Sequence, residues 1–254
     1  MKLLELFSGT HSIGKCAHSR GFEVYSLDRD LGAECPFGSG YKSDKHFKED
    51  IMKWNYKQYP TGYFDVITAS PVCLWWSNLR SAWIGRKLKG MDRPFTKEDI
   101  QNDINKYGKP MVDKVREIID YFKPKHYWIE NPRSSRMKNY ITDLDYYDVD
   151  YCKYSDWGYQ KRTRFWTNIK GFKPKLCKKD CNNMIITKTQ KIHKNRMGTS
   201  KTVIDNGKII RVNTKALREK YKDKKNITKI NPMTNRYERY RIPPKLINAF
   251  FDCM

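Results

Sequence analysis

The first 28 residues hold the pattern that most constrains the fold. Residues 2–7 (KLLELF) are mostly apolar and predict a short buried strand, which a Gly-containing segment of small residues (SGTHSIG) follows. Residues 15–21 then have a helical pattern that Gly21 ends, and residues 23–27 (EVYSL) predict a second strand stopped by Asp28. A strand, a Gly-containing turn, a helix and a strand with an acid at its tip form, in that order, the nucleotide-binding half of an open α/β sheet.

The same alternation of strands and helices continues along the chain. Further strands are expected at 64–69, 126–130, 147–152 and 164–168, and a helix with one apolar face is expected at 111–122. The polar, lysine-rich segment between Asn78 and Pro110 is expected to be a mobile loop with one short helix at 96–106. These elements predict an α/β fold.

Positive charge is concentrated toward the C-terminus. The whole chain has 51 Lys and Arg against 28 Asp and Glu, and from Lys170 onward the counts are 23 and 6. Such an excess implies a polyanionic partner, because binding to phosphates releases counterions. Nucleic acid is favoured over a membrane surface, since this part shows no amphipathic helix with a continuous apolar face.

The periodicity weakens after Ile169 and divides the chain into three parts. We expect an α/β domain at 1–169, a small basic module at 170–235, and a C-terminal helical segment at 236–254 that returns to the first domain. Within the module, Asn206-Gly207 lies between two β-prone runs and predicts a hairpin over 203–212.

The seven cysteines are scattered and odd in number, which argues against a disulfide framework. Cys177 and Cys181 are close in sequence and His193 follows, but the sequence identifies no fourth zinc ligand. We therefore expect reduced thiols and no metal. The chain also has neither a run of 18 apolar residues nor a secretory signal, so we expect an intracellular protein without a membrane partner.

Polar or reactive residues follow each expected strand of the α/β domain. Ligands of open α/β sheets bind outside the carboxyl ends of the strands, so these residues should converge. Each one alone has an ordinary explanation as a tight turn, a buried thiol, a solvated acid or a surface arginine. They are Phe7, Gly9, Thr10 and Ser12 after the first strand, Asp28 and Asp50, then Pro71, Cys73 and Ser77, then Glu130 and Asn131, and last Gln160, Arg162 and Arg164.

Taken in order, these segments resemble the motifs of the C5-cytosine DNA methyltransferase family. LELFSGTHSIG is similar to the family's first Gly-rich motif, DVITASPVCLWWS to its Pro-Cys motif, IENP to its Glu-Asn-Val motif, and QKRTR to its Gln-x-Arg-x-Arg motif. The resemblance covers about residues 3–168 and is greater to compact viral or phage members. Two departures are notable: His11 replaces a glycine and could crowd the methionine part of the cofactor, and Val72 replaces the proline before the cysteine.

The resemblance implies a Rossmann-like sheet that binds S-adenosylmethionine, and a basic module that recognises the target. Residues implied to contact the cofactor are Phe7, Gly9, Thr10, Ser12, Asp28, Asp50 and Pro71. Catalytic roles fall to Cys73 as nucleophile, Glu130 at N3 of cytosine, Arg164 at its O2 oxygen and Arg162 as a brace for the Cys73 loop. Ser77, Asn131 and Gln160 are implied to be supporting substrate contacts.

The expected activity is methyl transfer to carbon 5 of a cytosine flipped out of double-stranded DNA, by a monomer and through a covalent Cys73 adduct. The enzyme could be virus-encoded and act in the cytoplasm or nucleus of a host cell. Two alternatives remain open from sequence. One is a cytosine-C5 methyltransferase acting on RNA such as tRNA, and the other is a cofactor- and DNA-binding protein without turnover, which His11 and Val72 would explain.

Overall fold

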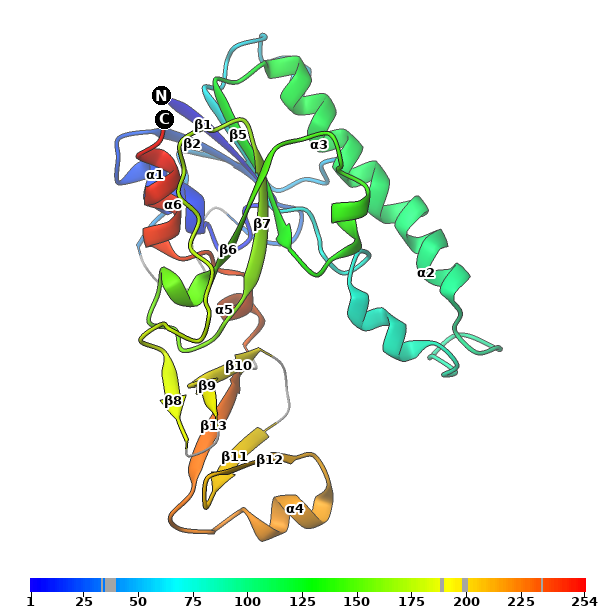
Figure 1. The fold of residues 1–254 in the computed structure, drawn as a ribbon. Coiled ribbons are helices and arrows are strands. Elements are labelled where there is room, and N and C mark those ends of the chain that lie inside the picture. The colour runs from blue at the N-terminus through cyan, green and yellow to red at the C-terminus, as the bar shows by residue number, and fades with distance from the viewer. Residues whose placement is uncertain (33, 35–39, 188–189, 198–200, 234) are drawn as a thin grey trace.

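The structure is a computed structural model that describes residues 1–254 except 33, 35–39, 188–189, 198–200 and 234. Its main element is a seven-stranded sheet in the order β3-β2-β1-β4-β5-β7-β6 (Figure 1). The strands are β1 (Lys2–Leu6), β2 (Glu23–Leu27), β3 (Lys45–Phe47), β4 (Val66–Ala69), β5 (His126–Pro132), β6 (Tyr146–Asp150) and β7 (Arg162–Thr167). Strands β1 to β5 pair in parallel, whereas β7 is antiparallel to both β5 and β6. The α/β fold expected from the sequence is confirmed.

Helices cover both faces of this sheet. Because side chains alternate along a strand, Leu3 and Leu4 of β1 enter different apolar clusters. The Leu3 side packs against α1 (Ser12–His18) and α6 (Pro244–Phe251), so the C-terminal helix returns to the first helix. The Leu4 side packs against α2 (Lys97–Asp103) and α3 (Lys109–Phe122).

Helix α3 has the single apolar face that the sequence predicted. Its residues Val112, Val115, Ile118, Ile119 and Phe122 are all buried on the sheet, as their helical spacing predicted. Burial of each such side chain contributes roughly 1.5–3 kcal/mol.

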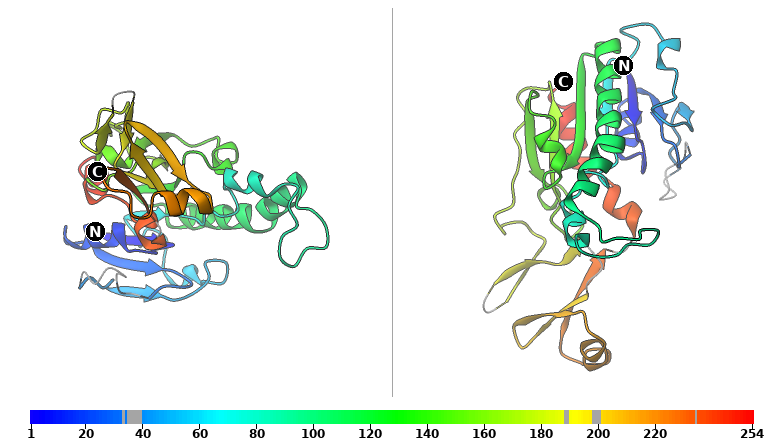
Figure 2. Two further views of the ribbon diagram at one scale, coloured as in Figure 1. Left: turned by 90° about the horizontal axis from the view of Figure 1, so that it is seen from below. Right: turned by 90° about the vertical axis from the view of Figure 1, so that its right-hand side faces the viewer.

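The segment before α3 differs from expectation. A single π turn over Ile104–Gly108 joins α2 to α3, so the helix is nearly continuous from Lys97. Gly108 lets the Trp76 ring pack closely against this turn, because a Cβ there would lie 2.9 Å from the ring. The rest of the expected loop contains a 3₁₀ segment at Asn78–Trp83 and forms an arm beside the sheet (Figure 2).

A second, smaller group of strands lies beyond the carboxyl-end edge of the main sheet (Figures 1 and 2). It has a four-stranded sheet ordered β10-β13-β11-β12 and a two-stranded sheet of β8 and β9. Its elements are β8 (Met184–Ile186), β9 (Lys191–His193), β10 (Asn195–Met197), β11 (Lys201–Asp205), β12 (Lys208–Val212), α4 (Lys215–Lys220), β13 (Thr228–Met233) and α5 (Arg236–Tyr240).

The hairpin expected in this group is present as β11 and β12. Asn206 and Gly207 have φ of 47° and 79°, the left-handed conformations that a tight two-residue hairpin turn requires. Helix α4 was missed because its residues are almost all polar. The Thr214 hydroxyl starts it by accepting the backbone N–H of Leu217.

Candidate active site

The turn after β1 contains three residues with left-handed backbone, and the Asp28 side chain stabilises it. Phe7, Gly9 and His11 all have positive φ, at 56°, 49° and 53°. The Gly9 N–H donates to Asp28 Oδ2 at 2.9 Å, and Oδ1 of the same carboxylate accepts the N–H groups of Asp30 and Leu31 at 2.9 Å each. Asp28 at the tip of β2 therefore fixes the turn after β1, and the half-buried Phe7 ring lies at its start.

His11 does not project out of this turn. Its side chain is fully buried, its Nε2 lies 2.8 Å from the Gly32 carbonyl oxygen, and its Nδ1 lies 3.7 Å from Glu5 Oε2. Burial lowers the pKa of His11, but the contact with the Glu5 carboxylate outweighs it and the pKa is raised. Glu5 also accepts the N–H groups of Ile13 and Gly14, both at 3.2 Å. The imidazole is thus buried against Glu5 and the Gly32 carbonyl oxygen, and the expected crowding of the cofactor by it stays a prediction.

Ser12 links the turn to the C-terminal segment, and its expected contact with the cofactor stays a prediction. Its hydroxyl lies 2.8 Å from the Thr10 hydroxyl and accepts the N–H of Ile242 at 3.1 Å. Ile242 precedes α6, so Ser12 ties the returning C-terminal segment to the turn. Asp50 lies at the end of the segment after β3 and is half-buried, with Oδ1 accepting the Met52 N–H at 3.0 Å.

Asn131 anchors the loop that carries the cysteine. Its Nδ2 donates to the carbonyl oxygen of Pro71 at 2.9 Å, and both groups are buried. Cys73 follows two residues later and is half-buried, whereas Val72 between them is 42% exposed and so makes little packing of its own. The loop is therefore attached to β5 through Asn131.

Glu130 and Lys161 meet beside Cys73. Lys161 Nζ lies 3.8 Å from Glu130 Oε1, and the Tyr151 hydroxyl donates to the same oxygen at 3.5 Å. Lys161 also donates to the Arg239 carbonyl oxygen at 3.2 Å. Burial raises the pKa of the Cys73 thiol; the Lys161 charge lowers it and the Glu130 charge raises it. A thiol, a carboxyl and an ammonium group thus share one electrostatic environment.

Both arginines of the QKRTR run lie elsewhere. In the pairing of β5 with β7, Asn131 is opposite Arg164 and Glu130 is opposite Phe165. Since side chains alternate along a strand, Arg162 and Arg164 project from the face opposite to that of Glu130.

Each arginine binds an acid of β6. Arg162 forms two hydrogen bonds with Asp150, at 3.0 and 2.7 Å, and Arg164 forms two with Asp148, at 2.8 and 2.9 Å. Arg164 also lies over the Tyr146 ring at 3.5 Å. The roles expected for them, at cytosine O2 and in bracing the Cys73 loop, stay predictions, and Lys161, which directly precedes Arg162 in sequence, is the residue that faces Glu130.

The two remaining candidates are Ser77 and Gln160. The Ser77 hydroxyl accepts the Leu79 N–H at 3.2 Å and starts the 3₁₀ segment of the arm, and its carbonyl oxygen accepts from Arg136 at 2.7 Å. Gln160 is exposed and lines a hollow of about 580 Å³ that continues along the smaller sheets. The other walls of this hollow include Lys179, Lys191, Arg196 and Arg211, so it is strongly basic.

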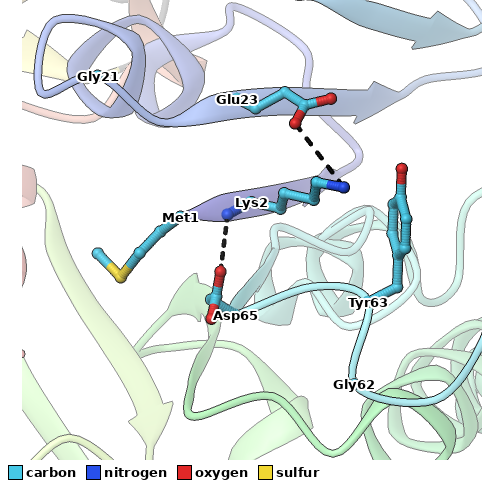
Figure 3. Close-up of a pocket in the computed structure, with 7 residues that line it drawn as sticks. All are labelled: Met1, Lys2, Gly21, Glu23, Gly62, Tyr63 and Asp65. Carbon is cyan, nitrogen blue, oxygen red and sulfur yellow. Dashed lines mark hydrogen bonds and ion pairs between the residues drawn. The ribbon is translucent and has the colours of Figure 1, made fainter.

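A second hollow, of about 610 Å³, opens at the amino ends of β1 and β2 (Figure 3). Lys2, Glu23 and Asp65 line it, with Lys2 Nζ 3.9 Å from Glu23 and the Lys2 N–H 2.9 Å from Asp65. Asp65 begins the turn into β4, so this hollow is at the edge of the sheet remote from Cys73. Ligands of open α/β sheets bind at the other edge, and we assign it no role in the chemistry.

Comparison with known proteins decides the family. The chain is 43% identical over 188 residues to a probable DNA (cytosine-5)-methyltransferase of Frog virus 3 (isolate Goorha), an alignment that covers 72% of this chain and 79% of the viral protein. The chain belongs to the DNA (cytosine-5)-methyltransferase family. No family model matches it.

Solved structures similar to this methyltransferase include DNMT2 of Spodoptera frugiperda and Dnmt2 of S. pombe. The TM-scores are 0.40 and 0.39, and the identities are 16% and 14% over 68% and 67% of this chain. The chain spans about half the length of these two proteins, 53% and 52%. Assignment to the family rests on the viral relative alone.

Lys161 lies beside Glu130 and Cys73, although the sequence pattern did not single it out. It stands at a variable position of its motif, between Gln160 and Arg162, and only Gln160, Arg162 and Arg164 carried an expectation there. Its signal was weak but present: a residue at the start of β7 that alternates with Arg162 must face the Glu130 side of the sheet once β5 and β7 are paired.

Proposed function

We propose that this chain transfers a methyl group from S-adenosylmethionine to carbon 5 of cytosine in DNA, with Cys73 as the covalent nucleophile. The observation that carries the proposal is the convergence of Cys73, Glu130 and Lys161 after the carboxyl ends of β4 and β5. The viral relative, by its description as a DNA methyltransferase, supports the substrate.

The turn after β1 fits the cofactor. The backbone has positive φ at Phe7 and Gly9, where the absence of a Cβ on Gly9 leaves room for close approach of a ligand, and the Phe7 ring offers a flat face. The Ser8 hydroxyl is buried with no partner among the described residues, as expected for a group that a ligand satisfies. We propose that Phe7, Gly9, Thr10, Asp28, Asp50 and Pro71 surround the cofactor, and that Ser12 supports them. When bound, S-adenosylmethionine supplies an electrophilic methyl group.

Cytosine needs activation before carbon 5 can accept a methyl group. Addition of the Cys73 thiolate to carbon 6 forms a carbon–sulfur bond and makes carbon 5 nucleophilic. Glu130 in its acid form donates a proton to N3 as the adduct forms. Carbon 5 would then take the methyl group, and S-adenosylhomocysteine would be left. Loss of the carbon-5 proton to solvent water, with return of the N3 proton to Glu130, expels the Cys73 thiolate and restores the aromatic ring.

We propose two roles for Lys161 in this reaction. Its ammonium group favours the thiolate form of Cys73, which burial otherwise opposes. It also holds the Glu130 carboxyl at 3.8 Å, assisted by the Tyr151 hydroxyl. Asn131 positions the nucleophile by holding the Pro71 carbonyl oxygen.

The basic module at 170–235 would bind the DNA. Its hollow begins at Gln160, next to Lys161 in sequence, and is lined by Lys191, Arg196 and Arg211. Such side chains bind phosphates and offset the few kcal/mol that unstacking a base costs. We propose duplex DNA as the substrate, a monomer as the acting form, and an intracellular setting. Among the described residues no helix is both long and apolar enough to traverse a bilayer.

Trapping tests the nucleophile directly. Duplex DNA carrying 5-fluorocytosine should form a covalent complex with the wild-type protein in the presence of S-adenosylmethionine, because fluorine at carbon 5 cannot leave as a proton does. Cys73→Ser should form none, and Cys253→Ser, a cysteine on the far side of the fold, should react like wild type. Trapping by Cys73→Ser would disprove the mechanism.

The same assay separates the alternatives. A tRNA containing 5-fluorocytidine, tested at matched salt, should react far more slowly than the duplex, and the reverse order would indicate an RNA methyltransferase. Binding of DNA and cofactor with neither trapping nor methyl transfer would indicate a protein without turnover.

A further inference from the structure

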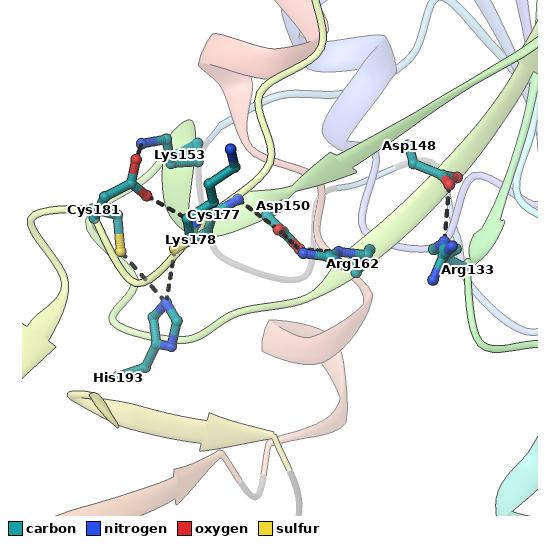
Figure 4. A network of polar contacts seen from close by, with 10 residues as sticks. Arg133, Asp148, Asp150, Lys153, Arg162, Cys177, Lys178, Cys181 and His193 are labelled. Atoms are coloured by element: carbon teal, nitrogen blue, oxygen red, sulfur yellow. Dashed lines mark hydrogen bonds and ion pairs between the residues drawn. The ribbon is translucent and has the colours of Figure 1, made fainter. Parts of the chain in front are cut away.

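Three thiols and an imidazole converge where the main sheet meets the smaller sheets. The ligand atoms of Cys152, Cys177, Cys181 and His193 all lie within 4.8 Å of one another. His193 Nε2 lies 3.6 Å from Cys177 Sγ and 3.4 Å from Cys181 Sγ (Figure 4). Cys152 supplies the fourth member, which could not be found from the sequence because it comes from 25 residues before Cys177.

These separations match a tetrahedral zinc site. With Zn–S bonds of about 2.3 Å and Zn–N bonds of about 2.1 Å, tetrahedral angles place sulfur and nitrogen about 3.5 Å apart. Four protein ligands would fill the coordination sphere, leaving no position for water, as in structural rather than catalytic zinc sites. We propose that this cluster binds one zinc ion with a structural role.

The ligands come from three separate parts of the chain. Cys152 lies in a 3₁₀ turn (Tyr151–Lys153) directly after β6, Cys177 and Cys181 lie in the loop between β7 and β8, and His193 ends β9. One ion would therefore tie the edge strand of the catalytic sheet to the first two strands of the basic module.

The surroundings hold the ligands in place. The Asn183 side-chain Nδ2 donates to the backbone carbonyl oxygen of Cys152 at 3.1 Å. The backbone carbonyl oxygen of Asn183 accepts the N–H of Lys194, next to His193, at 2.9 Å. The Cys177 N–H donates to Asp150 Oδ2 at 2.7 Å. Metal sites commonly show such hydrogen bonds behind the ligands.

Charge and packing both favour a metal here. Three thiolates and one Zn²⁺ leave a net charge of −1. Lys153, the residue after Cys152, supplies a positive charge nearby and forms an ion pair with Asp180 at 3.0 Å. Among the described residues of the basic module, the buried apolar cluster is small and consists of Val203, Val212 and Tyr221 around the β11–β12 hairpin. A module with so little core gains stability from a metal that replaces missing apolar burial.

One residue, Asp150, connects the cluster to Arg162 of the QKRTR segment. Asp150, which accepts the Cys177 N–H, is the carboxylate that binds Arg162 (Figure 4). Zinc would thereby fix the base of the module relative to β7, whose preceding residue Lys161 faces Glu130. This inference concerns the fold and stands independently of the proposed methyl transfer.

Metal content of the full chain is the first test. Protein produced with zinc in the medium and passed through gel filtration should contain about one zinc per chain by plasma mass spectrometry. Cys181→Ser, at a half-exposed position, should lose the zinc, and so should His193→Asn. The matched control Cys253→Ser should keep it. Wild type without zinc, or equal zinc in Cys181→Ser and wild type, would overturn the proposal.

Spectroscopy on the wild-type chain gives a second test that needs no variant. Replacement of zinc by cobalt(II) should produce the intense visible absorption of a tetrahedral thiolate site, which zinc should abolish on back-titration. Thiol titration of the denatured, metal-free protein should find all seven cysteines reduced. A spectrum of octahedral cobalt, or a disulfide among Cys152, Cys177 and Cys181, would contradict the site.

Discussion

Lys161 Nζ lies 3.8 Å from Glu130 Oε1, and both groups act on the Cys73 thiol. Lys161 directly precedes strand β7, and Glu130 lies near the end of strand β5. The pair places one ammonium group and one carboxyl group beside the cysteine that we propose as the nucleophile.

Removal of the Lys161 charge should slow adduct formation. The Lys161 charge lowers the pKa of Cys73, so Lys161→Met should raise that pKa further and reduce the thiolate fraction at neutral pH. The rate of 5-fluorocytosine trapping should rise with pH in both proteins, with the Lys161→Met profile displaced to higher pH. Lys161→Arg should keep a profile close to wild type. Superimposed profiles for Lys161→Met and wild type would refute the assignment.

Asn131 should position the nucleophile without touching the base. Asn131→Leu leaves the buried Pro71 carbonyl oxygen without its hydrogen bond, which costs about 1–3 kcal/mol. We expect a lower kcat for methyl transfer with little change in the KM for DNA, and slower trapping by Cys73. As a control, Asn168→Leu removes an amide at the far end of the same sheet and should leave kcat unaltered. A change confined to KM would instead indicate direct contact with DNA.

Arg164 should serve stability more than chemistry. Both Arg164 and Asp148 are largely buried, and Arg164→Met leaves the Asp148 carboxylate with only Arg133, at 2.9 Å. Breaking such a buried pair costs several kcal/mol, so the urea midpoint should fall clearly. The folded fraction should still react with 5-fluorocytosine, and Asp148→Asn in the same chain should recover part of the stability. An Arg164→Met protein as stable as wild type but unable to react would restore its expected role at cytosine O2.

His11 should make stability depend on pH. Its pKa is raised in the folded state, so the protonated imidazole beside Glu5 stabilises the fold fully below the unfolded pKa of about 6.5. That contribution is lost as pH rises through the higher folded-state pKa. The free energy of unfolding, measured in urea across this range, should therefore fall with rising pH in wild type and change less in His11→Asn. A steeper fall in the variant would show that burial, not Glu5, governs the group.

The basic hollow should determine the salt dependence of DNA binding. If Arg211 contacts a phosphate, Arg211→Ala should reduce the slope of log K against log salt by about 1 and weaken binding to all sequences alike. Lys57→Ala, on the opposite part of the main sheet, should leave the slope as it is. An unchanged slope in Arg211→Ala would remove this wall of the hollow from the DNA interface.

The sequence by itself determined the order of elements in the main domain and the ends of its strands. Hydrophobic periodicity predicted α3, β4 and β5, and it predicted Cys73 and Glu130 at strand ends. It could do so because burial of one helix face or of a whole strand determines the spacing of apolar residues within a short segment. The Asn206-Gly207 turn was likewise a local property.

Only the tertiary structure decided which partner each polar side chain meets. Pairing with β6 turned Arg162 and Arg164 toward Asp150 and Asp148, and pairing with β5 put Lys161 beside Glu130. These contacts depend on strand register between segments far apart in the chain, which no local pattern encodes. The same holds for Cys152, whose place beside Cys177, Cys181 and His193 exists only once β6 and the basic module are folded together.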